Sequence, residues 1–144
     1  MPTARDILEA KGRAVWAVAP TATVLDALGL MAEHDIGAVL VLDGDKLAGI
    51  LTERDYARKV VLAGRSSKDS QVKDVMTAQV VCVPPDRSVD ECMGLMTEKR
   101  CRHLPVVEHK NVVGVVSIGD LVKATIADRE FTIAQLQSYI TGCT

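Results

Sequence analysis

Apolar positions along the chain follow two spacings, and these spacings occur twice in the same order. Short apolar runs bounded by turn-forming residues predict strands, whereas apolar positions three or four apart predict helices. The predicted strands span 14–18, 38–42 and 47–51, and then 80–83, 104–107 and 112–116. The predicted helices begin at Thr23 and Thr52, and then at Ser88 and Ser117. The pattern therefore predicts an α/β fold made of two β-α-β-β-α units.

The first helix of each unit has an apolar face and a good N-cap residue, because serine and threonine hydroxyls accept from free amide groups at a helix start. The two faces are formed by Val24, Ala27, Leu28 and Met31, and by Val89, Cys92, Met93 and Met96. This spacing is that of a helix packed on one side.

The two sets of elements are copies of one another. Without a gap, Pro20 aligns with Pro85, Gly49 with Gly114 and Asp55 with Asp120. Upstream, residues 6–8 align with 74–76 once three extra residues are allowed in the first copy. The chain is therefore a tandem duplication. Copies of about 60 residues bury little core alone, so we expect them to pack about a pseudo-two-fold axis.

We expect the first unit to span 4–64, the second 71–126 and a helical tail 127–144, with a small polar linker at 63–70. In the tail, Ile133, Leu136 and Ile140 follow helical spacing. This stripe lies outside the repeat, and it either contacts a second copy of the chain or packs back on its own unit.

Charge and composition indicate which partners and which cell compartment to expect. The net charge of −2 comes without a basic stripe, so we expect no nucleic-acid partner. The apolar runs are shorter than the roughly 20 residues of a membrane span, and the N-terminus lacks an export signal. We therefore expect a cytoplasmic protein with no membrane partner. Its cysteines are expected to be reduced: Cys82, Cys92, Cys101 and Cys143.

Each copy passes from a strand into a hydroxyl residue followed three positions later by aspartate, at Thr52 and Asp55 and at Ser117 and Asp120. One interpretation is a capping box, in which the hydroxyl and the acid satisfy the helix start. The other adds a ligand, because a helix N-terminus suits a phosphate and a carboxylate accepts from ribose hydroxyls. Both interpretations remain open from the pattern alone.

The motifs KDVMT at 73–77, RHLPVV at 102–107 and GVVSIGDL at 114–121, with their first-copy partners, resemble a pair of cystathionine-beta-synthase (CBS) domains. The resemblance covers residues 4–126. It implies the Bateman module, two small α/β units packed sheet to sheet, which binds adenine nucleotides in clefts between the units. Free-standing bacterial examples resemble sensors rather than enzymes and usually form homodimers. The implied ligand is AMP in the first place, with ATP, NAD or S-adenosylmethionine as alternatives.

The resemblance also implies the site residues. Asp55 and Asp120 would bind ribose, and Thr52 and Ser117 would lie near the phosphate or ribose. Arg54, Arg102 and His103 are the candidate phosphate-binding cations. Ile50 and Val115 would line the base, and the strand entries at Ile36, Gly37 and Ala38 and at 101–103, beginning with Cys101, would present their backbone to the adenine edge. Val15, Trp16, Val80 and Val81 would close the other side, and Thr77 and Pro105 complete the set of ligand-binding candidates.

Several of these assignments have structural alternatives. Arg102 could form an ion pair with Glu98 or Asp120, and Trp16 could belong to the core or to an interface. The first copy has Leu40 in place of Pro105 and lacks the cationic pair of 102–103, so we expect the two sites to differ chemically. The three histidines are scattered, and we expect no metal site.

Three classes of function follow. The first is a regulatory nucleotide-binding module that acts as an energy or metabolite sensor on an unknown protein target, without catalysis. The second is a small nucleotide-processing enzyme that uses Cys82 or Cys101. The third is a structural dimerisation module whose clefts stay empty.

Overall fold

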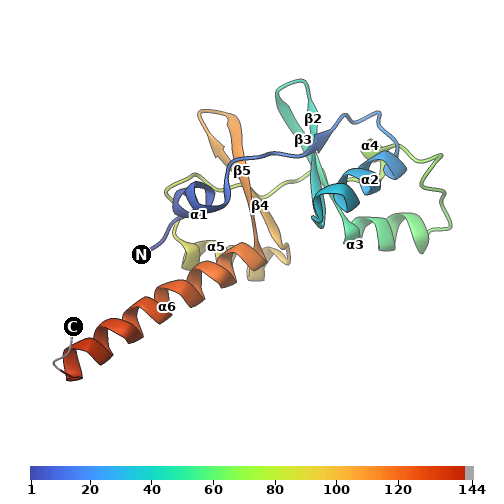
Figure 1. The fold of residues 1–144 in the computed structure, drawn as a ribbon. Coiled ribbons are helices and arrows are strands. Elements are labelled where there is room, and N and C mark those ends of the chain that lie inside the picture. Colours follow the sequence, from blue (N-terminus) through green and yellow to red (C-terminus); the bar gives the residue numbers. More distant parts are fainter. Residues whose placement is uncertain (142–144) are drawn as a thin grey trace. The chain divides into compact units, whose positions relative to one another are not determined.

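The computed structural model describes residues 1–141, and the side chains of all of these except 131 and 135–141. The fold is mixed α/β, as predicted (Figure 1). In chain order its elements are α1 (Ala4–Lys11), β1 (Ala17–Val18), α2 (Val24–His34), β2 (Ala38–Asp43), β3 (Lys46–Thr52), α3 (Glu53–Asp55), the π-helix η1 (Tyr56–Val61), α4 (Val72–Val75), α5 (Val89–Lys99), β4 (His103–Glu108), β5 (Asn111–Ser117) and α6 (Ile118–Thr141).

The predicted elements are present, but the first strand of each repeat is shorter than predicted. The segment 14–18 is a strand only at Ala17–Val18, and 80–83 forms a single bridge between Val83 and Val106. Each segment approaches proline, which has no amide hydrogen to continue a ladder. The predicted helix starts at Thr23 and Ser88 are confirmed, because both hydroxyls accept from the amide three residues later.

The chain forms two compact units. The first-repeat unit contains Ala14–Val81 and Lys110–Val112, and the second-repeat unit contains Met1–Arg13, Cys82–His109 and the chain from Val113 onward. In the first-repeat unit the sheet order is β1-β2-β3, with β1 parallel and β3 antiparallel to β2. Helices α2 and α4 and η1 supply apolar side chains to its core, which is aliphatic as expected.

The second-repeat unit has β4 and β5 paired in a two-stranded sheet. Helices α1, α5 and α6 lie around these strands (Figure 1). Its buried side chains come from every one of these elements and are again aliphatic or sulfur-containing: Ala4, Ile7, Leu8, Val83, Val89, Cys92, Met96, Leu104, Val106, Val116 and Leu121.

The short leading segments of the two repeats are exchanged between the units. Helix α1 precedes the first repeat in sequence but packs in the second-repeat unit, where the amides of Ala4 and Arg5 donate to the carbonyls of Arg87 and Pro85. Helix α4 precedes the second repeat but packs in the first-repeat unit, where the amides of Val72 and Lys73 donate to the carbonyls of Ala22 and Pro20. These bonds are equivalent under the repeat. Each unit is therefore completed by the leader of the other copy.

A glycine in the last strand of each unit allows the exchanged segment to approach. A Cβ on Gly49 would lie 2.6 Å from Met76 Sδ and 2.8 Å from the carbonyl oxygen of Thr77. A Cβ on Gly114 would lie 2.5 Å from a methyl carbon of Leu8. Met76 and Leu8 are equivalent under the repeat, so each exchanged segment contacts the last strand of its unit at the equivalent glycine.

The helix that follows the last strand differs in length between the copies. In the first copy α3 passes into η1, whereas α6 extends for 24 residues and ends far from the sheet of its own unit (Figure 1). Ile133 on α6 is 54% exposed. The side chains of Leu136 and Ile140 lie outside the described residues, so the contact of this stripe with a second copy stays a prediction.

Candidate functional site

The strand-to-helix junction of the first repeat is a complete capping box. The amide and hydroxyl of Thr52 donate to Asp55 Oδ2 at 3.0 and 3.1 Å, and the amide of Asp55 donates to Thr52 Oγ1 at 3.1 Å. The sequence Thr-x-x-Asp after a strand produces this geometry locally, because both groups lie in the first helical turn. The capping interpretation therefore holds at this junction.

The Asp55 carboxylate also has two partners from farther along the chain. Thr77 donates its hydroxyl to Oδ1 at 3.1 Å, and Lys59 Nζ lies 3.1 Å from the same oxygen. Asp55 is only 7% exposed. Both of its oxygens are therefore occupied by groups of the protein itself.

The junction of the second repeat has the same box but a different third partner. The amide of Ser117 donates to Asp120 Oδ2 at 2.8 Å, and the amide of Asp120 donates to Ser117 Oγ at 3.1 Å. Lys11, on the exchanged helix α1, donates to the same Oδ2 at 2.7 Å and to the carbonyl of Val115 at 2.8 Å. Oδ1 of Asp120 accepts no hydrogen bond from the described part of the chain.

Electrostatics keep the Asp120 carboxylate charged. Partial burial raises the pKa of this carboxyl, but hydrogen bonds from Lys11 and Ser117 and the charge of Lys11 together bring the pKa below its ordinary value. The side chain keeps 23% of its surface exposed. Asp120 is therefore an ionised acceptor with one open oxygen.

A groove of about 480 Å³ opens beside Asp120 between α1 and α6, within the second-repeat unit. Its volume lies in the range of small-molecule sites, roughly 300–1,000 Å³. Apolar side chains, two lysines and three aspartates line it: Pro2, Asp6, Ile7, Ala10, Lys11, Asp120, Lys123, Ala124, Ala127 and Asp128. Of the two acids predicted to bind ribose, Asp120 is therefore the one that lines this groove.

The two predicted phosphate-binding residues of the second repeat, Arg102 and His103, differ in exposure and in charge. Arg102 is exposed and forms no ion pair within the described residues, so neither Glu98 nor Asp120 holds it there. Its backbone carbonyl accepts from the amide of Ile118 at 2.9 Å, next to the capping box. Burial lowers the pKa of His103; the charge of Asp120 partly opposes this, and the charges of Lys11 and Arg102 lower it further. His103 is therefore mainly neutral near pH 7, and Arg102 is the cation of the pair.

The lowered pKa of His103 predicts a loss of stability in mild acid. The unfolded chain binds a proton near the ordinary pKa of 6.5, whereas the folded chain binds it only at lower pH. The unfolded state thus holds more protons in this window, so the free energy of unfolding falls as pH is lowered through 6.5 toward the folded pKa. Urea denaturation between about pH 7.5 and about pH 5.5 measures the slope.

The variant His103→Gln is expected to flatten that slope, because the titrating group is gone. His109→Gln at the exposed hairpin turn provides the matched control. A slope unaffected by His103→Gln would contradict the assignment.

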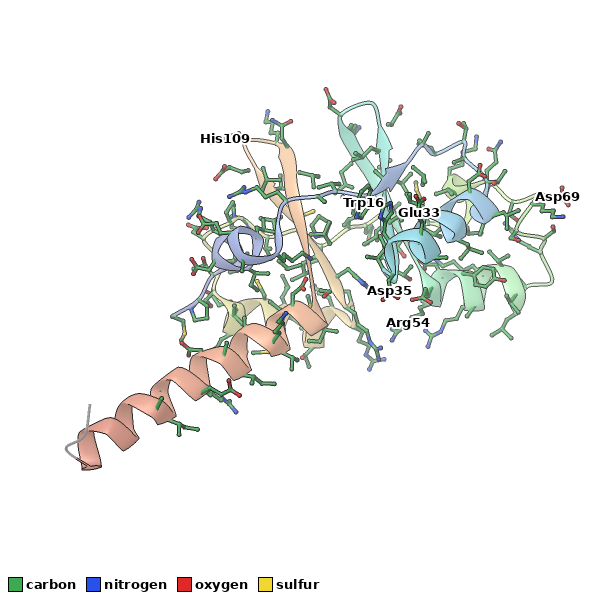
Figure 2. All side chains as sticks on the ribbon, in the orientation of Figure 1. Trp16, Glu33, Asp35, Arg54, Asp69 and His109 are labelled. Atoms are coloured by element: carbon green, nitrogen blue, oxygen red, sulfur yellow. The ribbon has the colours of Figure 1, made fainter. Side chains whose placement is uncertain are left out.

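The other predicted residues of the first repeat lie around its own junction. The carbonyl of Gly37 accepts from the amide of Glu53 at 3.0 Å, and Ala38 pairs with Thr52 in the sheet. Ile50 pairs with Thr77 through two backbone hydrogen bonds. Half-buried Val15 precedes Trp16, and exposed Arg54 lies at the start of the helix after β3 (Figure 2). Gly37 and Ala38 therefore lie at the Thr52 junction, and Ile50 lies beside Thr77, which donates to Asp55.

Trp16 is neither a core side chain nor an isolated surface residue. It is 39% exposed and stacks on His34, with ring centroids 3.5 Å apart and planes inclined by 11°. Figure 2 shows it beside α2, the helix that carries Glu33. His34 ends α2, as a cation-capable residue near a helix C-terminus should.

A second groove, of about 280 Å³, lies in the first-repeat unit at the C-terminal end of α2. Ile36, Gly37 and Glu53 line it, and Asp55 does not. In the first-repeat unit, Asp55 therefore does not line this groove.

The remaining candidates are divided between the units. Cys101 and Pro105 belong with Asp120 to the second-repeat unit, where the carbonyl of Pro105 accepts from the amide of Val83. Val80 and Val81 belong to the first-repeat unit, although the repeat places them in the second copy.

Sequence reasoning missed both lysines that contact the two acids. Lys59 lies four residues after Asp55, and the helical i,i+4 rule would have found it. Lys11 lies 109 positions from Asp120 and carries no local signal.

The described residues give no support to metal or thiol chemistry. No cluster of three or more histidine, cysteine or acidic side chains suited to a metal occurs among them. Burial raises the pKa of the Cys82, Cys92 and Cys101 thiols, which disfavours the reactive thiolate. Cys143 lies outside the described residues. Within the described chain, no helix has the length and apolarity that crossing a bilayer demands.

Comparisons with known proteins agree on one family. The CBS-domain family model matches residues 4–62 and 72–127. The mitochondrial CBS domain-containing protein CBSX3 of Arabidopsis thaliana is 40% identical, over 97% of this chain and 72% of its own. The solved structure of a protein with CBS domains from Burkholderia ambifaria is 57% identical with a TM-score of 0.86, over 88% of this chain and 96% of its own.

A more distant structure bears on ligands. It is a CBS domain pair solved in complex with 5′-methylthioadenosine and S-adenosyl-L-methionine, 25% identical with a TM-score of 0.75, over 86% of this chain and 99% of its own. The two matched segments, the duplicated junctions and these relatives together identify the chain as a member of the CBS-domain family, with two CBS domains in tandem.

Proposed function

We propose that this CBS pair is a regulatory module that binds an adenine nucleotide at Asp120 and acts as an energy or metabolite sensor without catalysing a reaction. AMP is the first choice of ligand, and ATP and NAD(H) are the alternatives. The related pair that binds two adenosine derivatives supports an adenosine-containing ligand. We expect a homodimer that acts on a protein target.

The observation that carries this proposal is the state of the Asp120 carboxylate. It is ionised, it lies at a groove large enough for a nucleoside, and its Oδ1 is open toward a donor. A ribose offers two adjacent hydroxyl donors, and a charged acceptor makes the stronger kind of hydrogen bond to them.

The same reasoning favours unequal sites in the two repeats. Asp55 is buried and already accepts from Thr52, Thr77 and Lys59, so a ribose would have to displace internal donors. Asp120 would lose no internal partner at Oδ1. We therefore propose that the site at Asp120 binds more tightly.

Replacing Asp120 by alanine should weaken nucleotide binding by about 10- to 100-fold, because hydrogen bonds to a charged group contribute about 1.5–3 kcal/mol. Isothermal titration with AMP, ATP, NAD and NADH measures this change. GMP serves as the control ligand for the base.

Asp43→Ala provides the control variant, because Asp43 is an exposed aspartate of the first-repeat unit. It should bind as the unmodified protein does. Equal affinity in the Asp120 and Asp43 variants would refute the proposed site, and absence of heat with every adenine nucleotide would favour the purely structural dimerisation module.

The enzyme alternative requires a reactive group, and the raised thiol pKa values of Cys82 and Cys101 argue against them. Mass spectrometry of AMP, ATP and NADH after incubation with the protein tests this directly. Unchanged nucleotides are expected, and turnover would overturn the non-catalytic account.

A further inference from the structure

The two units differ at a contact next to the acid of each junction. In the first-repeat unit Thr77 donates its amide to the carbonyl of Ile50 at 2.9 Å and its hydroxyl to Asp55 Oδ1 at 3.1 Å. In the second-repeat unit Lys11 Nζ donates to the carbonyl of Val115 at 2.8 Å and to Asp120 Oδ2 at 2.7 Å. The acceptors are repeat equivalents, so one ammonium group replaces a backbone amide and a hydroxyl.

The difference follows from the three extra residues in the first leader. Helix α4 ends at Val75, and Thr77 then runs beside β3 as an extended residue. Helix α1 instead continues to Lys11, whose side chain returns to β5. A long flexible side chain therefore stands where the other unit has main chain.

This substitution leaves donors and acceptors open in the second-repeat unit. An ammonium group has three N–H donors, and Lys11 uses two of them on partners within the described residues. Asp120 keeps Oδ1 open, and both side chains line the groove between α1 and α6. An open donor and an open acceptor thus lie on ion-paired side chains 2.7 Å apart.

Such a pair suits two adjacent hydroxyl groups. A hydroxyl both donates and accepts, so the 3′-hydroxyl of a ribose would donate to Asp120 Oδ1 while the 2′-hydroxyl accepts from Lys11. Removing one hydroxyl would leave a charged group without its partner, and a site built on hydrogen bonds discriminates strongly against the analogue that lacks one.

We propose that Lys11 is a specificity-determining residue of the Asp120 site, which reads the ribose diol and rejects the 2′-deoxy ligand. The inference rests on the proposed function of this site. It adds that a residue from the exchanged leader of the first repeat sets the ligand preference of the second.

The test compares AMP with 2′-deoxy-AMP by isothermal titration. The unmodified protein should prefer AMP by about 10-fold or more, because each tenfold preference needs only one charged hydrogen bond. Lys11→Met keeps the length of the side chain without its donors. It should weaken AMP binding by about 10-fold and reduce the preference to about 3-fold or less.

Two further variants separate the donor role of Lys11 from charge and folding. Lys11→Arg keeps charge and donors and should keep the preference for AMP. Lys123→Met removes the other lysine of the groove, which has no ion pair among the described residues, and should also keep it. Thermal melts of all variants show whether each is folded.

The failures of the two proposals are distinguishable. If Lys11→Met binds AMP with the original preference, or binds it more tightly, the role of Lys11 is overturned while the Asp120 site stands. If the unmodified protein binds neither ligand, the proposed function fails and the role of Lys11 fails with it.

Discussion

Gly49→Ala is expected to lower the free energy of unfolding by about 3 kcal/mol, the upper end of the usual cost of overpacking. The added methyl would lie 2.8 Å from the backbone carbonyl oxygen of Thr77 and 2.6 Å from Met76 Sδ. A side-chain atom can rotate away, but a main-chain carbonyl moves only with the segment that holds it. The exchanged segment after α4 should therefore separate from β3, and urea denaturation followed by circular dichroism measures the loss.

Gly29→Ala is the matched control, because a Cβ at Gly29 meets nothing within 4 Å and the residue lies inside α2. Alanine is the better helix former there, so this variant should gain about 0.5–1 kcal/mol. If Gly49→Ala unfolded at the same urea concentration as the unmodified protein, the close approach of the exchanged segment would be refuted.

Asp55→Ala is expected to cost about 2–4 kcal/mol of stability, because several partly buried donors lose their charged acceptor. The carboxylate is 7% exposed and accepts from Thr52, Thr77 and Lys59. Its removal would leave the Thr52 amide and the Thr77 hydroxyl without their acceptor, whereas the Thr52 hydroxyl would still accept from the backbone amide of residue 55. The midpoint of urea denaturation reports the change.

Asp26→Ala tests the same helix position without the burial. Asp26 is the third residue of α2 and is exposed, and its backbone amide rather than its carboxylate makes the capping bond. This variant should change stability by less than about 0.5 kcal/mol. A similar loss in both variants would mean that the partners of Asp55 add nothing beyond its place in the helix.

Much of the fold could be predicted because its determinants are local. The N-caps Thr23 and Ser88 and the Thr52–Asp55 box depend on residues three positions apart, and these the structure confirms. Strand periodicity located β2 to β5 within one residue at each end. Prediction failed at 80–83, where an apolar run beside prolines makes only one bridge. The apolar pattern of this segment indicates that it is buried, but it does not require a continuous series of strand hydrogen bonds.

The candidate site could be predicted only in part. Sequence located both acids, but their partners come from different distances along the chain. Lys59 is one helical turn from Asp55, whereas Lys11 reaches Asp120 across 109 positions. Nothing in the pattern around either acid distinguishes an occupied carboxylate from one with an open oxygen, because that difference depends on which distant segment packs beside it.

The sequence by itself determined the duplication, the order of strands and helices, the capped junctions and the CBS family, since each of these is written in spacings within one repeat. Only the tertiary structure decided that the leaders are exchanged, that Thr77 and Lys59 occupy Asp55, and that Lys11 leaves an oxygen of Asp120 open. The physical reason is that two copies with the same local preferences present the same docking surface. The choice of leader then depends on chain connectivity and long-range packing, which no local pattern encodes.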